Sequence, residues 1–533
     1  MPNPPSKPGD TSIFPLLTKK HEIVLFSSTA IALYGYDQGM MSLINTNNSY
    51  LSTMQIPKES PIVGIIVSVY YLGCAVGAVI ASWFADREGR KPSIFACLAT
   101  TSFGNLLMFI SGLSMNGSSP WNGGAIGCML AGRVIMGLGV GGIDATIPVY
   151  SSELSSDGAR GRALAQEFQM NIFGLLMAYA INLGVTIGLG KDNQWAWRTP
   201  IIIMQIFPVL LMSFISQLPE TPRWLMSQER SDDAKRALEK VYGSKEAESK
   251  YADLVESSKQ ASSETITYTD MLLPGRSQFH PTTITIMGQI NQALTGYGAV
   301  SVYGPQIFEL LGFSTTKAEF LTLGNYISYF LMMTFAWLSI DVYGRRKLLL
   351  LGSIGLFFSF ILLTLFGGLA ANYPSIPDLA VEIPGSITLF SATAIFGIGW
   401  LATVWLIPTE IYPNTARAQG SAISVIVWGL ANFVITLLTP IGFNGLKYGL
   451  FAVFALTNAI AGVWTWRYLP ESGGRSFEEN QGFFESAGKE GTWVVKKVEG
   501  GRFLKMPGKE GEDEEGGQQQ EGGEREPLLG RRG

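Results

Sequence analysis

The sequence has few charged residues and few of the side chains that build catalytic or metal sites. Charged residues make up 15% of the 533 residues, and there are 2 histidines and 3 cysteines. Cys74, Cys97 and Cys128 lie in apolar runs without metal-ligand spacing, which indicates small buried side chains. His21 and His280 lie outside those runs, and no cluster of nucleophile, base or metal ligands stands within them. We therefore do not expect an enzyme.

An excess of positive charge is also lacking. The formal net charge is −4, with acidic residues concentrated near the end of the chain, so no basic surface for nucleic acid is indicated. The chain is instead rich in apolar residues: 47% are hydrophobic and the mean hydropathy is +0.23. These values favour a membrane protein.

The apolar residues form two sets of six long runs, each near the roughly 20 residues that a spanning helix needs. The first set lies near residues 23–44, 62–85, 93–113, 124–150, 163–189 and 199–218. The second set lies near residues 282–311, 317–340, 348–370, 386–411, 418–442 and 447–469. We predict an all-α membrane protein with twelve transmembrane helices in two six-helix halves.

Polar segments divide the chain into five parts. We expect an N-terminal segment at 1–21, a first half at 22–218, a linker at 219–280, a second half at 281–469 and a tail at 470–533. The linker is rich in charge and serine, which predicts short amphipathic helices without a core of their own. From about residue 481 the tail is rich in Gly, Glu and Gln, which predicts disorder.

The distribution of Lys and Arg among the short loops predicts the orientation. One side collects most of the basic residues, and the positive-inside rule places this side, with both termini, linker and tail, in the cytosol. Sequons at Asn47 and Asn116 fall on the opposite side. We expect the plasma membrane. An acidic dileucine pattern from Glu524 to Leu529, of the kind that sorting adaptors bind, makes a vacuolar or endosomal membrane the alternative.

Three loop motifs occur twice, about 250–257 residues apart. The sequence DREGRK from Asp86 returns as DVYGRRK from Asp341, and the motif ending at Glu153 returns at Glu410. LPETPR from Leu218 returns in part as LPESGGR. Three ordered recurrences indicate parallel repeats, as in transporters whose halves rock against each other.

The repeated motifs place acids and arginines at the cytosolic ends of helices. We hypothesise that they form a cytosolic gate, in which ion pairs bridge neighbouring helices and hold this side shut in the outward-open state. Alternatively, these charges only anchor the loops at lipid headgroups. The gate residues are Asp86, Arg90, Glu153, Arg160, Asp341, Arg345, Arg346, Glu410 and Arg417.

Together these motifs resemble the sugar porter family of the major facilitator superfamily, over roughly residues 20–480. YGYDQG from Tyr34, PETPR from Pro219, EIYP from Glu410 and PESGG from Pro470 complete the family's set, and the pattern around Asp37 resembles fungal monosaccharide transporters. The resemblance implies the major facilitator fold, with a solute site between the halves near the membrane midplane. It also implies alternating access without a cofactor.

Asp37 lies in the first run and Arg133 in the fourth, where an isolated charge is costly. We therefore expect the two to face each other or water, and the resemblance implies that Asp37 takes up a proton beside Arg133. A guanidinium favours the charged form of a nearby carboxyl group, so separating the two would link proton uptake to conformation. The alternative is a structural pair in a facilitator. For Asp144, close to the cytosolic motif, we expect a local cap or ion pair.

A sugar site combines amides with aromatic side chains. The resemblance places Tyr34, Gln292 and Trp405 in this site, whereas Phe168, Tyr329 and Trp428 stand where the family usually has amides, as do Ala293 and Gly298. Helical spacing indicates compensation by other amides on the same faces. Alternatively, each of these amides joins neighbouring helices. The compensating amides are Asn171, Gln289, Asn325 and Asn432.

The sequence thus predicts a transporter that moves a monosaccharide or similar solute across a lipid bilayer, with proton symport through Asp37. A hexose, a pentose, a polyol and a less polar cyclic compound remain open as the solute. A facilitative sugar carrier and a non-transporting nutrient sensor on the same fold are the alternative functions.

Overall fold

The computed structural model describes most of the chain up to residue 473 and short pieces of the tail. The described residues are 19–57, 60–113, 124–154, 160–261, 266–373, 377–413, 416–473, 480, 482–484, 494–495, 497–499 and 503–505. The sequon at Asn116 and the pattern from Glu524 to Leu529 lie outside them, as do most of the tail predicted to be disordered and the side chain of Arg160.

The first half contains eight helical segments that make six crossings. They are α1 (Lys19–Ile44), α2 (Asn48–Met54), α3 (Pro61–Glu88), α4 (Arg90–Ile110), α5 (Gly124–Leu154), α6 (Arg160–Leu189), α7 (Gln194–Met204) and α8 (Ile206–Ile215). The short helix α2 connects two crossings. Its N-cap Asn47 is buried and accepts a hydrogen bond from the Tyr50 N–H at 3.0 Å.

The second half repeats the pattern with two interrupted crossings. Its segments are α13 (Phe279–Leu294), α14 (Tyr297–Val302), α15 (Gly304–Leu310), α16 (Thr315–Tyr343), α17 (Arg345–Asn372), α18 (Asp378–Phe396), the π-helix η2 (Gly397–Leu401), α19 (Ala402–Ile411), α20 (Arg417–Leu446) and α21 (Gly449–Tyr468). Segments α13, α14 and α15 form one broken crossing, and α18, η2 and α19 form another.

Ten crossings in the described chain are long and apolar enough to span a membrane. The other two are α1 and the crossing α13–α15, which is broken into short helices, and they complete the predicted twelve. Large apolar side chains such as Ile80, Phe103, Leu331 and Leu351 are exposed on the outer surface, as expected for contact with lipid. The all-α prediction is confirmed for the membrane part.

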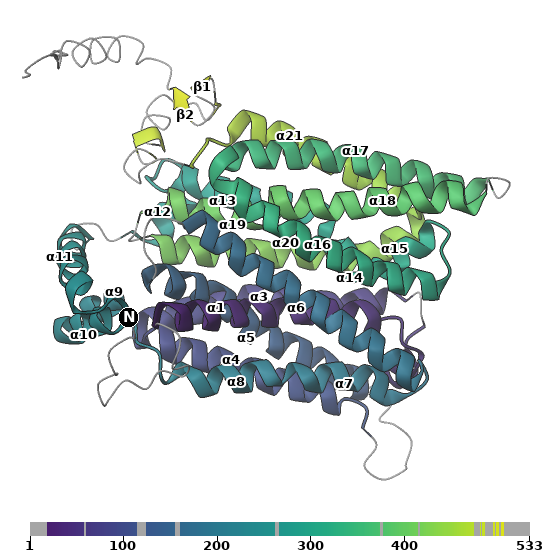
Figure 1. Ribbon diagram of the computed structural model, residues 1–533, viewed down its shortest axis with the longest axis horizontal. Coiled ribbons are helices and arrows are strands. Elements are labelled where there is room, and N and C mark those ends of the chain that lie inside the picture. Colours follow the sequence, from purple (N-terminus) through teal and green to yellow (C-terminus); the bar gives the residue numbers. More distant parts are fainter. Residues whose placement is uncertain are drawn as a thin grey trace, which may run out of the picture.

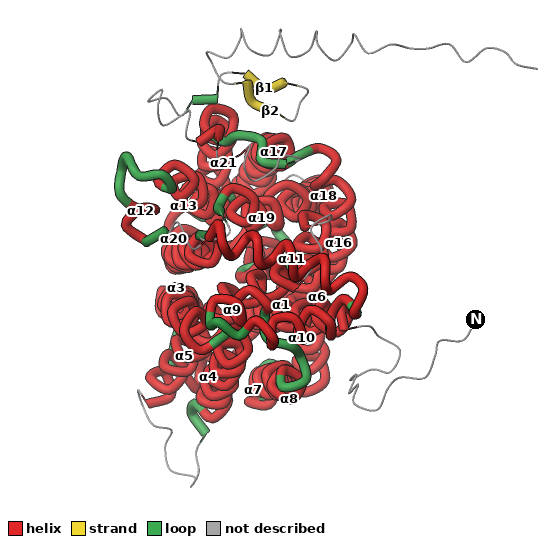
Figure 2. The backbone as a smooth tube through the Cα atoms, turned by 90° about the vertical axis from the view of Figure 1, so that its left-hand side faces the viewer, coloured by secondary structure: helices red, strands yellow, loops and turns green. Residues whose placement is uncertain are grey.

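The two halves lie side by side with their helices roughly parallel (Figure 1). Viewed along the helices, the first half forms one bundle and the second half the other (Figure 2). Contacts between the halves are made mainly by α3 with α20 and by α6 with α16. We call the end that carries the two Gly-Arg loops, Gly89–Arg90 and Gly344–Arg345, the motif face, and the other end the opposite face.

The break between α13 and α14 requires glycine. Gly296 has a φ of +81°, and a Cβ at this position would lie 2.6 Å from the Phe454 ring. A side chain would therefore be disfavoured both by conformation and by space. The break turns α14 toward α1 and α20, with which it is in contact.

The linker forms four helices at the motif face: α9 (Pro222–Ser227), α10 (Ser231–Tyr242), α11 (Ser244–Ala261) and α12 (Tyr268–Leu272) (Figure 1). The prediction of short helices is correct, but the linker also has a small core. Leu225 packs with Ala234 and Ala237, because α10 turns its apolar face toward α9.

The described part of the tail contains a short antiparallel pair of strands, β1 (Lys497–Glu499) and β2 (Phe503–Lys505). Ahead of it, Phe484 is buried, with its ring 5.2 Å from the ring of His280 at the start of α13. The composition of the tail predicts neither feature.

Candidate functional site

Asp37 and Arg133 form a buried ion pair between α1 and α5, as the sequence predicts. The Arg133 Nη1 atom donates to Asp37 Oδ1, and each residue is 1% exposed. Arg133 also donates from Nε to the Ile66 carbonyl and from Nη2 to the Val67 carbonyl, both at 3.2 Å. One guanidinium therefore ties α5 to both α1 and α3.

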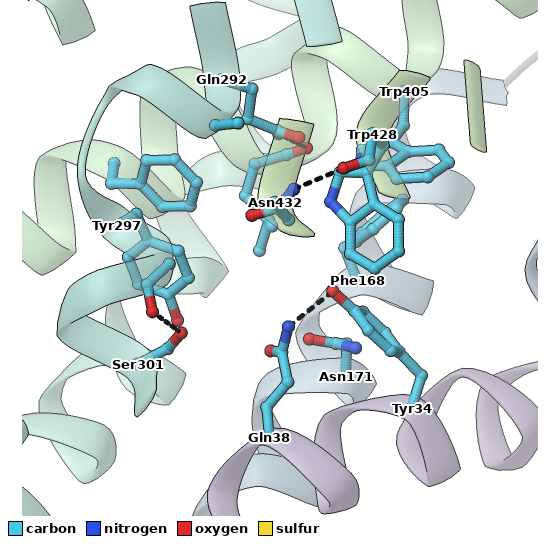
Figure 3. A pocket seen from close by; sticks show the side chains of 14 residues that line it. Tyr34, Gln38, Phe168, Asn171, Gln292, Tyr297, Ser301, Trp405, Trp428 and Asn432 are labelled. Carbon is cyan, nitrogen blue, oxygen red and sulfur yellow. Dashed lines mark hydrogen bonds between the residues drawn. The ribbon is translucent and has the colours of Figure 1, made fainter. Parts of the chain in front are cut away.

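A small cavity lies between the halves. It is lined by α1 and α6 of the first half and by α13, α14, α18, η2, α19 and α20 of the second (Figure 3). Seven residues predicted for the solute site line it: Tyr34, Phe168, Asn171, Gln292, Trp405, Trp428 and Asn432. Helices α1, α13 and α14 contribute much of the polar lining, with Tyr34, Gln38, Gln292, Tyr297 and Ser301.

Amides line the cavity with their nitrogens already engaged by the protein. Asn432 Nδ2 donates to the Trp428 carbonyl at 2.9 Å, and Asn171 Nδ2 to the Ile31 carbonyl at 3.4 Å. Gln38 Nε2 donates to the Tyr34 hydroxyl at 2.7 Å. The oxygens of these amides are left to accept hydrogen bonds from a solute (Figure 3).

Gln292 is held by the π-helix. Its Nε2 atom donates to the carbonyls of Trp400 and Leu401, both at 3.2 Å. A π-turn leaves backbone carbonyls without the usual helical partner, and Gln292 uses the two at the end of η2. This fixes the direction of the Gln292 side chain and directs its amide oxygen away from η2.

Aromatic rings cover one side of the cavity. The Trp428 ring lies 5.4 Å from that of Tyr34 and 5.9 Å from that of Trp405, and Phe168 lies 5.6 Å from Trp405. Such rings provide an apolar surface for the C–H faces of a cyclic solute. The replacement of amides by Phe168 and Trp428 therefore produces an aromatic wall.

Three residues predicted for the solute site lie elsewhere. Gln289 Nε2 donates to Ser424 Oγ at 2.6 Å, and Asn325 accepts from Thr393 Oγ1 at 2.7 Å. Both therefore join neighbouring helices, which is the alternative that the sequence left open. Tyr329 is buried behind the cavity, with its ring 5.3 Å from that of Tyr297.

Other lining residues are absent from the prediction, among them Gln38, Tyr297 and Ser301. Gln38 is four residues after Tyr34 on the same helical face, so spacing could have identified it. Tyr297 and Ser301 have the same spacing, but only the turn after Gly296 brings their helix α14 to the cavity.

The chain was then compared with known proteins. The sequence pattern of the family described as "Sugar (and other) transporter" matches residues 23–484. The chain belongs to this sugar transporter family.

Among curated relatives, "Sugar transporter STL1" of Saccharomyces cerevisiae is 29% identical over 91% of the transporter and 85% of the relative. "Major myo-inositol transporter IolT" of Bacillus subtilis is 28% identical over 86% and 92%. The solved structure of the major facilitator superfamily proton:xylose symporter XylE with 6-bromo-6-deoxy-D-glucose has a TM-score of 0.71 and 23% identity. That match covers 87% of the transporter and 99% of XylE. It confirms the major facilitator fold.

The cavity of the transporter is small. Its free volume is about 30 Å³, well below the roughly 150 Å³ of a cavity that is known to hold benzene. At the level of the cavity, Gln169 of α6, which lies between the lining residues Phe168 and Asn171, donates to the Phe330 carbonyl of α16 at 3.2 Å and accepts from Trp337 Nε1 at 2.9 Å. At the opposite face, Lys191 pairs with Glu319 at 2.5 Å. Side-chain contacts thus join the two halves at the level of the cavity and at the opposite face.

The predicted gate residues form a separate network in each half. In the first half, Arg90 pairs with Asp86 at 3.0 Å and with Glu153 at 3.7 Å. In the second half, Arg345 pairs with Asp341 at 3.0 Å and with Glu410 at 2.6 Å. These pairs bridge neighbouring helices, as predicted, but helices of the same half.

Two further gate residues have other positions. The Arg346 side chain donates to the Trp466 carbonyl, not to a gate carboxylate. Arg417 begins α20, at the start of the crossing that packs against α3.

Two glutamates of the repeated loops were not predicted as gate residues. Glu220 accepts from the N–H groups of Arg90 and Lys91 at 3.2 and 3.0 Å, at the start of α4. Glu471 accepts from the N–H groups of Arg345 and Arg346 at 2.9 and 3.1 Å, at the start of α17. Burial raises the pKa of the Glu471 carboxyl group, and these N–H donors oppose that shift. The sequence PET, which contains Glu220, returns as PES, which contains Glu471, so the repeat could have identified both glutamates.

Proposed function

We propose that the transporter moves a polyhydroxylated solute, a sugar or a polyol, by alternating access and with a proton carried by Asp37. The supporting observation is one cavity that combines amide oxygens with an aromatic wall and connects to a buried acid–arginine pair. Hydroxyl groups donate to amide oxygens, and the C–H faces of a ring pack on aromatic rings. The family, and relatives named for sugar and myo-inositol transport, support the same solute class.

A chain of side chains joins the cavity to the ion pair. Gln38 lines the cavity and lies 3.4 Å from the Tyr71 hydroxyl. The Tyr71 ring lies 5.3 Å from the Tyr70 ring, over which the Arg133 guanidinium sits at 4.6 Å. A solute that engages Gln38 would therefore act on the packing around Arg133.

This arrangement supports coupling. Arg133 is bound to carbonyls of α3 and to Asp37 of α1, so a movement of α1 against α3 separates the pair. A separated Asp37 binds a proton more readily, because its charge has lost its partner. By linkage, the proton and the solute then favour the same conformations. We place the motif face in the cytosol, following the positive-inside rule.

Transport assays on vesicles containing the purified protein test this proposal. An inward proton gradient of one pH unit supports about tenfold accumulation for one proton per solute. We expect labelled sugar or polyol to accumulate and a protonophore to abolish the accumulation. Competition by hexoses, pentoses and polyols then identifies the solute.

Asp37→Asn tests the residue assignment. This variant should exchange solute across the membrane but not accumulate it, and Asp192→Asn, in the exposed loop after α6, is the matched control. Accumulation by Asp37→Asn would contradict the assignment. Exchange without accumulation by the unmodified protein would indicate a facilitative carrier, and the absence of both would indicate a sensor.

A further inference from the structure

A second carboxyl group lies deep in the first half, and neither the solute cavity nor the ion pair includes it. Asp144 of α5 is 7% exposed. Within the described part of the chain it has no hydrogen bond or salt bridge, so the cap or ion pair expected from the sequence is absent. An ionised carboxylate without a counter-charge is costly at such depth, whereas the charge of Asp37 is matched by Arg133.

The position of Asp144 is on the way from Asp37 to the motif face. Helix α5 runs from the opposite face to the motif face, and Asp144 follows Arg133 by 11 residues, a rise of about 16 Å. Asp37 is seven residues from the end of α1 at the opposite face. A proton that leaves Asp37 for the motif face must pass the level of Asp144.

Helix α3 packs against the stretch of α5 that lies between Arg133 and Asp144. Glycines of α5 bring the helices into close contact: a Cβ on Gly137 would lie 2.2 Å from the Tyr70 carbonyl oxygen, and one on Gly141 would lie 2.1 Å from that of Cys74. Tyr70 and Cys74 are both buried, and they stand at these two contacts, along the stretch of α5 between Arg133 and Asp144. Figure 2 shows α3 and α5 side by side in the first half.

Within the described residues, no cation forms a salt bridge with Asp144. From α3, Cys74 lies against Gly141, one turn of α5 before Asp144. From α4, the Cys97 thiol lies against Gly142, and from α20, Val425 packs near Ala145. The group is thus free to exchange a proton without breaking an ion pair.

We infer that Asp144 is a second proton-carrying residue, which takes the proton released by Asp37 and passes it to the motif face. In this step Asp37 loses the proton and is left as a carboxylate paired with Arg133. The Asp144 carboxylate becomes a neutral carboxyl group, and it then gives the proton to water when the motif face opens. One proton moves and no other bond changes. This inference rests on the proposed proton symport.

Three measurements on Asp144→Asn vesicles test the inference. Solute exchange should persist at a rate near that of the unmodified protein, because exchange needs no proton release. Accumulation under a gradient of one pH unit should fall from about tenfold to about one. The dependence of solute binding on pH at the opposite face should remain, because Asp37 is intact, whereas Asp37→Asn should lose it.

Asp144→Glu should restore accumulation, and Asp192→Asn again serves as the control. Accumulation by Asp144→Asn equal to that of the unmodified protein would overturn the inference. The inference would also be overturned if Asp144→Asn and Asp144→Glu both lost solute exchange and thermal stability. That result would show that Asp144 has a structural role. If the unmodified protein exchanges solute but never accumulates it, the proposed proton symport is itself wrong. The role of Asp144 in that symport then falls with it.

Discussion

The two halves carry the same loop motif but hold its arginine differently. Arg90 and Arg345 each donate to a carbonyl at the end of the preceding helix, at 2.9 and 3.0 Å, and each pairs with the aspartate four residues earlier at 3.0 Å. The cross-helix pair differs. Arg345 reaches Glu410 with two nitrogens, at 2.6 and 3.2 Å, whereas Arg90 approaches Glu153 only to 3.7 Å.

The surroundings explain this difference. Ser472 donates to Glu410 at 2.6 Å, and the start of α6 packs on the second network, where a Cβ on Gly161 would lie 2.4 Å from Asp341 Oδ1. The first network is instead covered by the linker, whose Trp224 Nε1 donates to the Asp86 carbonyl at 3.0 Å. One repeated motif therefore serves as a helix-end brace in both halves, and in the second half it also contacts the start of α6 in the other half.

The largest difference between the halves should appear when the cross-helix acids are removed. Glu410→Ala leaves the buried Arg345 without its closest partner, which should cost about 3 kcal/mol. Glu153→Ala also removes an acid from a buried arginine, but the contact of 3.7 Å is too long for a hydrogen bond, so this change should cost less. Thermal unfolding in detergent measures both. Equal shifts in melting temperature would contradict the asymmetry.

The helix-capping glutamates should instead behave alike. Glu220→Ala and Glu471→Ala each remove an acceptor from two backbone N–H groups, so each should cost about 1–2 kcal/mol. The same unfolding assay applies, with the glutamine variants as controls that keep one acceptor. A loss confined to one half would show that this part of the repeat is also unequal.

Gly161 tests the contact between the halves at the motif face. A methyl group there would collide with Asp341 and Arg345 and should push α6 away from the second network. We expect Gly161→Ala to increase the labelling of a cysteine introduced in the motif-face pathway several-fold. Gly188→Ala, which meets nothing within 4 Å on the same helix, is the matched control. Unchanged labelling would show that the second network does not help to close the motif face.

The smallest effect is expected at the opposite face, where the half-exposed Lys191 pairs with Glu319. Lys191→Glu should repel Glu319 and favour opening there by about 1 kcal/mol, or about fivefold in population. The additional change Glu319→Lys should restore the pair. Labelling of a cysteine in the opposite-face pathway reports the effect, and failure of the double variant to recover would show that the pair does not hold this face.

The sequence predicts the fold and the ion pair well because both follow from strong local signals. The runs of apolar residues define the crossings, and a charge as costly as Asp37 or Arg133 at membrane depth needs a partner. The recurring motifs also identify Arg90 and Arg345 as members of ion-pair networks.

The solute cavity is predicted less completely, because the direction of an amide depends on its neighbours. Gln289 and Asn325 have the spacing of cavity residues but bind Ser424 and Thr393. Ser301 reaches the cavity only because the chain turns at Gly296, and Gln292 owes its orientation to a π-turn. Neither the turn of α14 nor the π-turn has a periodic signature in the sequence.

The most direct test of proton coupling at Asp37 is the pH of the medium when solute is added to de-energised vesicles. The unmodified protein should cause alkalinisation that depends on the solute, because each solute carries a proton inward. Asp37→Asn should cause none, while still exchanging solute. Alkalinisation that persists in Asp37→Asn would contradict the account.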